Sequence, residues 1–261
     1  MPHNLKVTYR EAGQGDEVLV LLHGFLCDAR CWRPQLTGLS QNRRVVAWDA
    51  PGAGGSEDPP APFTLVDWSH ALAAFLDRIG VERAHFLGLS WGGVLAQVFC
   101  QLYAQRVRGL ILADTYAGWR GSLPAETCRL RLARCEADAS LPPQAMAARW
   151  TPEMFSAQAS STLWDELRPV IADFHPAGFS LMARSLAETD TTVQLAHIRA
   201  HKVPTLLIWG ENDQRSSLSI ARHMHAQIPH ARLVVLAQAG HLSPMECPEA
   251  FNAEVHAFLC L

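Results

Sequence analysis

Hydrophobic residues follow two alternating patterns along the chain, short continuous runs and longer stretches with helical spacing. The short runs are rich in β-branched residues and end at turn residues, which is typical of parallel strands buried on both faces. They predict strands over 17–22, 44–48, 84–88, 107–113, 205–209 and 232–237. The intervening stretches predict helices over 65–79, 91–103, 217–227 and from near 248 to 259. This alternation indicates an α/β fold with a mostly parallel sheet, to which residues 5–10 can add an antiparallel edge strand.

The segment from 118 to 192 interrupts this alternation. It has no strand pattern, and its helical spacing predicts helices over 126–137, 142–149, 161–171 and 176–188. Because the segment is too long for a loop, we interpret it as a helical lid inserted into a core domain made of 1–117 and 193–261. Its many aromatic residues cannot all be buried within short helices. Some are therefore expected to pack onto the core and enclose a cavity.

Composition and charge narrow the class of protein. The 261 residues are 49% hydrophobic and 18% charged, with a formal net charge of −3, which fits a soluble globular protein and excludes disorder and coiled coil. No long block of one charge favours a nucleic acid or a membrane as partner, and no apolar run reaches the roughly 18 residues of a membrane span. Seven cysteines without a CxxC pair are typical of reduced thiols. We expect a cytoplasmic protein, and the oligomeric state stays open.

The strongest chemical signal is the pentapeptide Gly88-Leu89-Ser90-Trp91-Gly92. It lies where a predicted strand ends and a predicted helix begins, which is the context of a G-x-S-x-G nucleophile elbow and distinguishes it from a chance match. A serine held in a strained turn presents its hydroxyl above the sheet, while the flanking glycines avoid collisions with neighbouring backbone. Ser90 is therefore the predicted nucleophile.

A serine hydroxyl needs a base, and His241 is the best candidate because it follows the last predicted strand after Gly240. The base in turn needs an acid, for which we favour Asp213 in the turn after the penultimate strand. Asp114, after the strand that follows the elbow helix, is the rival, and Glu211 is a minor third option.

Two further features concern anions and metals. The tetrahedral oxyanion needs donors, and the backbone N–H groups of Phe25 and Trp91 are the candidates, since each directly follows a strand end or the nucleophile. His197 and His201 have the i, i+4 spacing of metal ligands, but no third ligand is nearby and Pro204 indicates a connection. The predicted chemistry therefore uses no metal and no cofactor.

The arrangement resembles the α/β-hydrolase fold superfamily over nearly the whole chain. The matching pieces are His23-Gly24-Phe25, the turn DAPGAGGS at 49–56, the elbow, the turn GEND at 210–213 and Gly240-His241. The resemblance implies an eight-stranded, mostly parallel sheet with a Ser-His-Asp triad above its carboxyl edge. The single lid and the GLSWGG elbow resemble carboxylesterases, 3-oxoadipate enol-lactonases, C–C bond hydrolases of meta-cleavage products and cofactor-free perhydrolases.

These alternatives differ in what they demand of the site. A serine at the elbow argues against the dehalogenases and epoxide hydrolases of this fold, which use Asp, and favours hydrolysis of a small ester or lactone. A C–C hydrolase needs cations for its acidic substrate, which Arg120, Arg149 and Arg184 of the lid can supply. Some members of the fold are receptors that bind a ligand without turning it over.

The predicted substrate pocket combines residues beside the nucleophile with aromatic residues of the lid. Its expected lining is Phe25, Leu26, Trp91, Trp119, Trp150, Trp164, Phe179 and Leu242. Such a pocket would enclose a small acyl or aryl group rather than a long lipid chain.

Overall fold

The structure of the protein is a computed structural model that describes residues 5–260. Its centre is a seven-stranded sheet in the order β1-β3-β2-β4-β5-β6-β7, in which β1 (Tyr9–Ala12) pairs antiparallel with β3 and the other neighbours pair in parallel. The six predicted apolar runs form the parallel strands: β2 (Val18–Leu22), β3 (Arg44–Trp48), β4 (Ala84–Leu89), β5 (Val107–Ala113), β6 (Thr205–Gly210) and β7 (Arg232–Leu236).

The sheet departs from the sequence expectation at its edge. The family resemblance implied eight strands, and the described residues form seven, the number given by the six apolar runs and the edge segment. The backbone before β1 bonds to a loop instead of a strand. The amide of Lys6 donates to the Glu57 side chain, and that of Thr8 donates to Ser56 Oγ at 2.9 Å. The edge strand consequently begins at Tyr9 rather than near residue 5.

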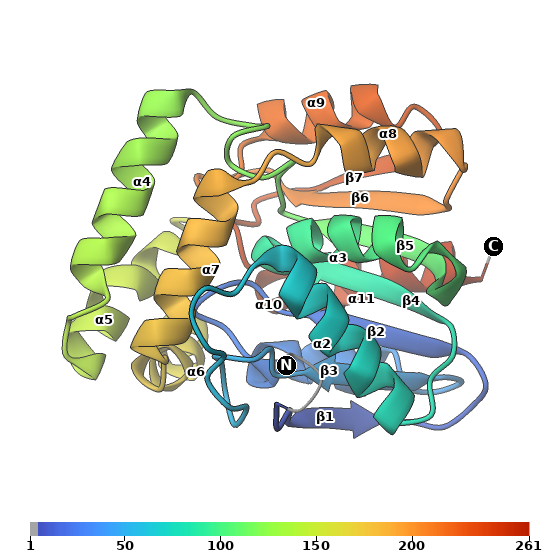
Figure 1. The fold of residues 1–261 in the computed structure, drawn as a ribbon, viewed down its shortest axis with the longest axis horizontal. Coiled ribbons are helices and arrows are strands. Elements are labelled where there is room, and N and C mark those ends of the chain that lie inside the picture. Colours follow the sequence, from blue (N-terminus) through green and yellow to red (C-terminus); the bar gives the residue numbers. More distant parts are fainter. Residues whose placement is uncertain (1–4, 261) are drawn as a thin grey trace.

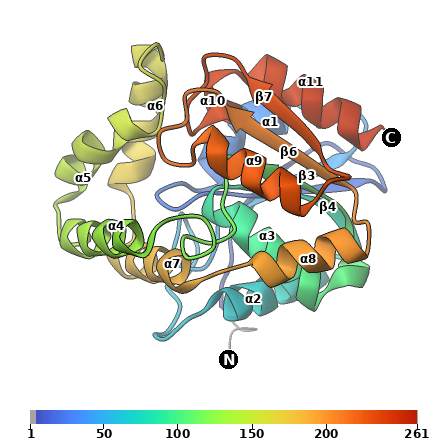
Figure 2. The same cartoon turned by 90° about the horizontal axis from the view of Figure 1, so that it is seen from above.

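Helices cover both faces of the sheet, as Figures 1 and 2 show. One face carries α2 (Leu65–Arg78), α3 (Trp91–Leu102), α8 (Thr192–Ala200) and α9 (Leu218–Gln227), which pack in that order, and the other carries α1 (Arg33–Gly38) and α11 (Pro248–Leu259). Local sequence explains the start of α2, where Thr64 and Asp67 form a reciprocal capping box. No helix within residues 5–260 has the length and apolar character needed to cross a membrane.

The helix α8 corrects one expectation. The stretch around His197 was interpreted as a connection because of Pro204, but it is helical and buries Leu195 and Ile198. The apolar residues of this short helix pack close to α3 and α9, so tertiary contact outweighs the nearby proline.

The inserted helices lie together at one end of the sheet, beyond the strand ends that precede Ser90 and Asp213 (Figure 1). They are α4 (Ala125–Asp138), α5 (Pro143–Trp150), α6 (Ser161–Ala172) and α7 (Pro176–Glu188). The helix α7 contacts the core closely, since a Cβ built on Gly178 would lie 2.0 Å from the Gly52 carbonyl oxygen. His175, just before α7, is 2.6 Å from Asp58. The predicted lid boundaries at residues 118 and 192 stay a prediction.

Candidate active site

Ser90 lies in the tight turn between β4 and α3. Its backbone has φ 53° and ψ −115°, which is strained for a residue with a side chain. The turn leaves no room beside it: a Cβ on Gly88 would lie 2.4 Å from the Gly92 carbonyl oxygen, and a Cβ on Gly92 would lie 2.2 Å from that of Leu22. These contacts account for both flanking glycines of the motif.

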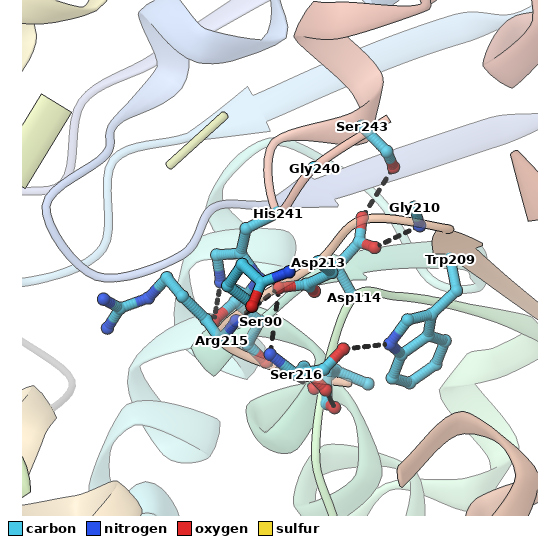
Figure 3. A network of polar contacts seen from close by, with 12 residues as sticks. Ser90, Asp114, Trp209, Gly210, Asp213, Arg215, Ser216, Gly240, His241 and Ser243 are labelled. Carbon is cyan, nitrogen blue, oxygen red and sulfur yellow. Dashed lines mark hydrogen bonds and ion pairs between the residues drawn. The ribbon is translucent and has the colours of Figure 1, made fainter. Parts of the chain in front are cut away.

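His241 connects the Ser90 hydroxyl to a carboxylate. Its Nε2 is 3.0 Å from Ser90 Oγ, and its Nδ1 is 2.8 Å from Asp213 Oδ2 (Figure 3). Because an ionised carboxylate can only accept, Nδ1 carries the proton and Nε2 is free to accept from the hydroxyl. All three residues are buried, with Ser90 2% exposed. The structure thus brings the three predicted residues into one hydrogen-bonded chain that can transfer a proton from Ser90.

The two candidate acids have different partners. Asp213 Oδ1 accepts from the amides of Arg215 and Ser216 at 2.8 and 2.9 Å, which leaves Oδ2 aimed at His241. Asp114 instead accepts from the Gly210 amide at 2.7 Å and from Ser243 Oγ at 2.5 Å (Figure 3). Burial, and then the charge of Asp213, raise the pKa of Asp114 well above its usual range. The rival carboxyl therefore supports the loop after His241 rather than the imidazole.

The third option, Glu211, has another partner in the same turn region. Its side chain accepts from the backbone amide of Gln238 at 3.1 Å. This contact connects the turn after β6 to the turn after β7. Glu211 therefore has a different partner from Asp213, which contacts the imidazole of His241.

The segment after β2 lies against the nucleophile. A Cβ built on Gly24 would be 3.3 Å from Ser90 Cβ, which places the neighbouring Phe25 at the site. Trp91 is the first residue of α3, where helix amides have no partner within the helix. These positions are compatible with the two predicted oxyanion donors.

His23 is a residue whose side chain the sequence analysis did not consider. Its Nδ1 donates to the Gly24 carbonyl at 2.7 Å, and its Nε2 accepts from the Ala50 amide at 3.0 Å. This pairing requires the neutral imidazole, and burial lowers the pKa of His23 accordingly. The imidazole therefore fixes the segment beside Ser90 to the turn at 49–56. In the sequence, the position of His23 directly before Gly24 and Phe25 was the feature that could have indicated this role.

Aromatic residues of the lid meet Phe25. Its ring centroid is 5.8 Å from that of Trp150 and 5.6 Å from that of Phe179. Trp119 and Trp150 line a cavity of about 450 Å³, whereas Leu26 and Phe179 line a narrow crevice next to the turn at 49–56.

The other predicted pocket residues have contacts of their own. The indole of Trp91 packs edge-on against Trp68 and donates to Ser185 Oγ of α7 at 2.9 Å. The Arg168 guanidinium lies over the ring of Trp164, and Trp164 lines neither of these two cavities. Leu242 is buried, and its amide donates to the Met154 carbonyl at 2.9 Å.

The lid arginines considered for substrate binding are engaged elsewhere. Arg149 pairs with Asp138 at 2.7 Å and Arg184 with Glu136 at 2.7 Å, while Arg120 donates to a backbone carbonyl. The 450 Å³ cavity is instead lined by Arg131, Arg134 and Arg215.

The two imidazoles of the histidine pair that suggested a metal lie next to each other, tilted by 31°. The imidazole centroids of His197 and His201 are 4.1 Å apart. Across residues 5–260, no group of three or more His, Cys, Asp or Glu side chains is placed to hold a metal ion.

Comparison with known proteins identifies the family. The model of the alpha/beta hydrolase family matches residues 19–254. This chain belongs to that family. Both the fold and the likeness to esterases and enol-lactonases predicted from the sequence are confirmed.

Several relatives within this family align along nearly the whole chain. The 3-oxoadipate enol-lactonase 2 of Acinetobacter baylyi is 28% identical over 98% of this chain and 94% of its own. A 2-hydroxy-6-oxononadienedioate/2-hydroxy-6-oxononatrienedioate hydrolase of Burkholderia vietnamiensis is 29% identical over 98% and 91%. Among solved structures, the malate-bound esterase of Thermogutta terrifontis is 29% identical over 98% of this chain and 93% of its own, with a TM-score of 0.88. The chain is thus a hydrolase-family protein whose relatives are named for different substrates.

Proposed function

We propose that this protein is a serine hydrolase that cleaves a small carboxylic ester or lactone through an acyl-enzyme. The observation that carries the proposal is the hydrogen-bonded chain from Ser90 through His241 to Asp213. A hydroxyl, a neutral imidazole and an orienting carboxylate in this order are the elements needed to activate a serine. The enol-lactonase and esterase relatives are consistent with this reaction class.

In each half of the proposed reaction, His241 accepts one proton and then returns it. Ser90 Oγ attacks the carbonyl carbon while Nε2 accepts the hydroxyl proton, and the amides of Phe25 and Trp91 bind the oxyanion. Nε2 then returns the proton to the leaving oxygen, and the acyl group stays on Ser90. A water molecule, deprotonated by the same nitrogen, attacks the acyl carbon. Nε2 then returns this proton to Ser90 Oγ as the bond to the acyl carbon breaks and the acid is released. Asp213 stabilises the imidazolium formed in each half of the cycle.

Labelling and turnover test this proposal together. An alkyl fluorophosphonate should add one phosphonyl group to the wild type, on the peptide that contains Ser90, with loss of 4-nitrophenyl butyrate hydrolysis. Ser90→Ala should remain unlabelled and lose at least about three powers of ten in kcat. Ser219→Ala, at an exposed serine on α9, is the matched control and should behave as wild type. Near-normal turnover by Ser90→Ala would refute the covalent mechanism, and a protein that binds esters without releasing nitrophenol would be a receptor.

A second candidate is hydrolysis of a C–C bond in an acidic ring-fission product. The three arginines that line the 450 Å³ cavity favour it, since such a dienoate carries carboxylates. The relative from Burkholderia vietnamiensis named above has this kind of substrate in its name. Fast loss of dienoate absorbance beside negligible ester turnover would establish this alternative; the opposite ratio would eliminate it.

A further inference from the structure

The 450 Å³ cavity lies between the lid and the loop that follows Asp213. Two of its arginines, Arg131 and Arg134, come from α4, and the third, Arg215, comes from the loop. Trp119 and Trp150 provide aromatic walls. The cavity therefore combines apolar surface with three guanidinium groups from two separate parts of the chain.

Positive charge in the cavity exceeds negative charge. Glu153 is the one carboxylate in the lining and is shared, with Oε2 at 3.1 Å from Arg134 Nη1 and at 3.3 Å from Arg215 Nη1. Arg131 donates to neutral oxygens, the Tyr116 hydroxyl at 3.2 Å and the Arg215 carbonyl at 3.0 Å. Within residues 5–260 no carboxylate lies within ion-pair distance of Arg131. Outside the lining, Asp138 Oδ2 lies 3.5 Å from Arg134 Nε. Two carboxylates thus face the three arginines, and the remaining positive charge favours a further anion.

Arg215 joins this cavity to the catalytic residues. It is two residues beyond Asp213, to which its amide donates, and its side chain extends away from Ser90 and His241 (Figure 3). Only 11% of that side chain is exposed, and its buried Nε has no hydrogen-bond partner among the described residues. The guanidinium carbon lies 5.2 Å from the ring centre of Phe25 and 5.0 Å from that of Trp150. Arg215 and Trp150 therefore line the cavity and also contact Phe25, the residue after Gly24 beside Ser90.

We infer that this cavity binds a free carboxylate of the substrate, so that the enzyme prefers anionic esters or lactones to neutral ones. The inference rests on the proposed hydrolase function and names its substrate class. A guanidinium matches a carboxylate with two parallel hydrogen bonds, and the interaction strengthens where aromatic walls exclude water. The substrate carboxylate would pair with Arg131 and compete with Glu153 for Arg215.

A matched pair of esters measures this preference. Mono(4-nitrophenyl) adipate carries a free carboxylate, and 4-nitrophenyl methyl adipate has the same chain with that charge masked. The wild type should show a kcat/KM at least about tenfold higher for the anionic ester, the size expected for a charge-assisted hydrogen bond. Equal kcat/KM values for the two esters would overturn the inference.

Substitutions in the cavity should move the two esters differently. Arg131→Gln should lower kcat/KM about tenfold for the anionic ester and leave the neutral ester within about twofold. Arg131→Lys keeps the charge and should retain most of the preference. Glu153→Gln removes the competing carboxylate and should raise kcat/KM for the anionic ester several-fold. Arg129→Gln is the control, because this exposed residue of the same helix pairs with Glu126 outside the cavity.

The results separate binding from a structural role of the arginines. Equal losses for both esters in Arg131→Gln would mean that the arginine only supports the fold, and an unchanged preference would mean that the carboxylate binds elsewhere; both overturn the inference. If the wild type turns over neither ester, the proposed function fails, and the cavity is tested by binding alone. Adipate should then quench the fluorescence of Ser90→Ala protein with a Kd about tenfold lower than that of the same protein carrying Arg131→Gln. Equal Kd values would overturn the inference independently of catalysis.

Discussion

Replacing Asp213 by Asn tests the proposed base with almost no change of shape. In the wild type, Asp213 Oδ1 accepts from the amides of Arg215 and Ser216, and Oδ2 accepts from His241. In the variant the side-chain oxygen must keep facing the two backbone donors, so its NH2 group faces His241 Nδ1. That group donates, so Nδ1 must become the acceptor and the imidazole proton moves to Nε2. The nitrogen next to Ser90 then cannot accept the hydroxyl proton.

The expected cost follows from the loss of this base. A tautomer change with intact geometry lowers kcat by about 10⁴ in serine proteases. At about 1.36 kcal/mol for each factor of ten, this is about 5.4 kcal/mol of transition-state stabilisation. The measurement is kcat/KM on 4-nitrophenyl butyrate, with thermal unfolding to verify that the variant is folded.

Asp114→Asn is the matched control. The raised pKa of Asp114 favours its neutral form, and an amide can still accept from Gly210 and contact Ser243. We expect a loss of less than about tenfold. The reasoning would be refuted if Asp213→Asn retained a tenth of wild-type activity or more. A loss of three powers of ten in Asp114→Asn alone would move the acid role to Asp114.

Three further predictions concern the elbow, acid stability and substrate size. Gly92→Ala should destabilise the fold by about 3 kcal/mol, because the added Cβ would collide with the Leu22 backbone. Gly80→Ala is the control and should cost about 1 kcal/mol, since Gly80 has φ 71° but open space around it. Similar urea midpoints for the two variants would contradict this prediction. Burial lowers the pKa of His85 to about 4, so the unfolded chain binds more protons and stability falls as the pH drops from about 6.5 to 4. In urea titrations at pH 7.5 and 5, His85→Gln should lose less stability between the two pH values than the wild type. An equal loss in both proteins would contradict a role of His85 in this pH dependence. For neutral 4-nitrophenyl esters, kcat/KM should rise about fourfold per CH₂ up to butyrate or hexanoate, since each buried CH₂ contributes about 0.8 kcal/mol. It should have fallen again at laurate. A preference for laurate would indicate a lipase.

Features that depend on local interactions could be predicted from the amino-acid sequence. Short apolar runs bounded by turn residues are typical of parallel strands, so the six parallel strands were predictable to within a residue or two. The run at 232–237 also forms a strand, although β7 lies at the edge of the sheet and is partly exposed. The elbow was predictable because a strand, a serine between glycines and a helix follow one another within a few residues. Ser90 and His241 could be paired from the chain order that this fold imposes.

Contacts between long side chains, in contrast, depend on how distant segments pack together. Asp114 and Asp213 follow the neighbouring strands β5 and β6, so sequence pattern left both near the imidazole, and the backbone amides after Asp213 direct it to His241. The arginines that face the cavity also differ from those considered from the sequence. The helix α4 carries charged residues around most of its surface, so its pattern does not show which side faces the core. Packing between segments far apart in the chain determines which side of that helix faces the loop at Arg215, so local periodicity cannot predict it.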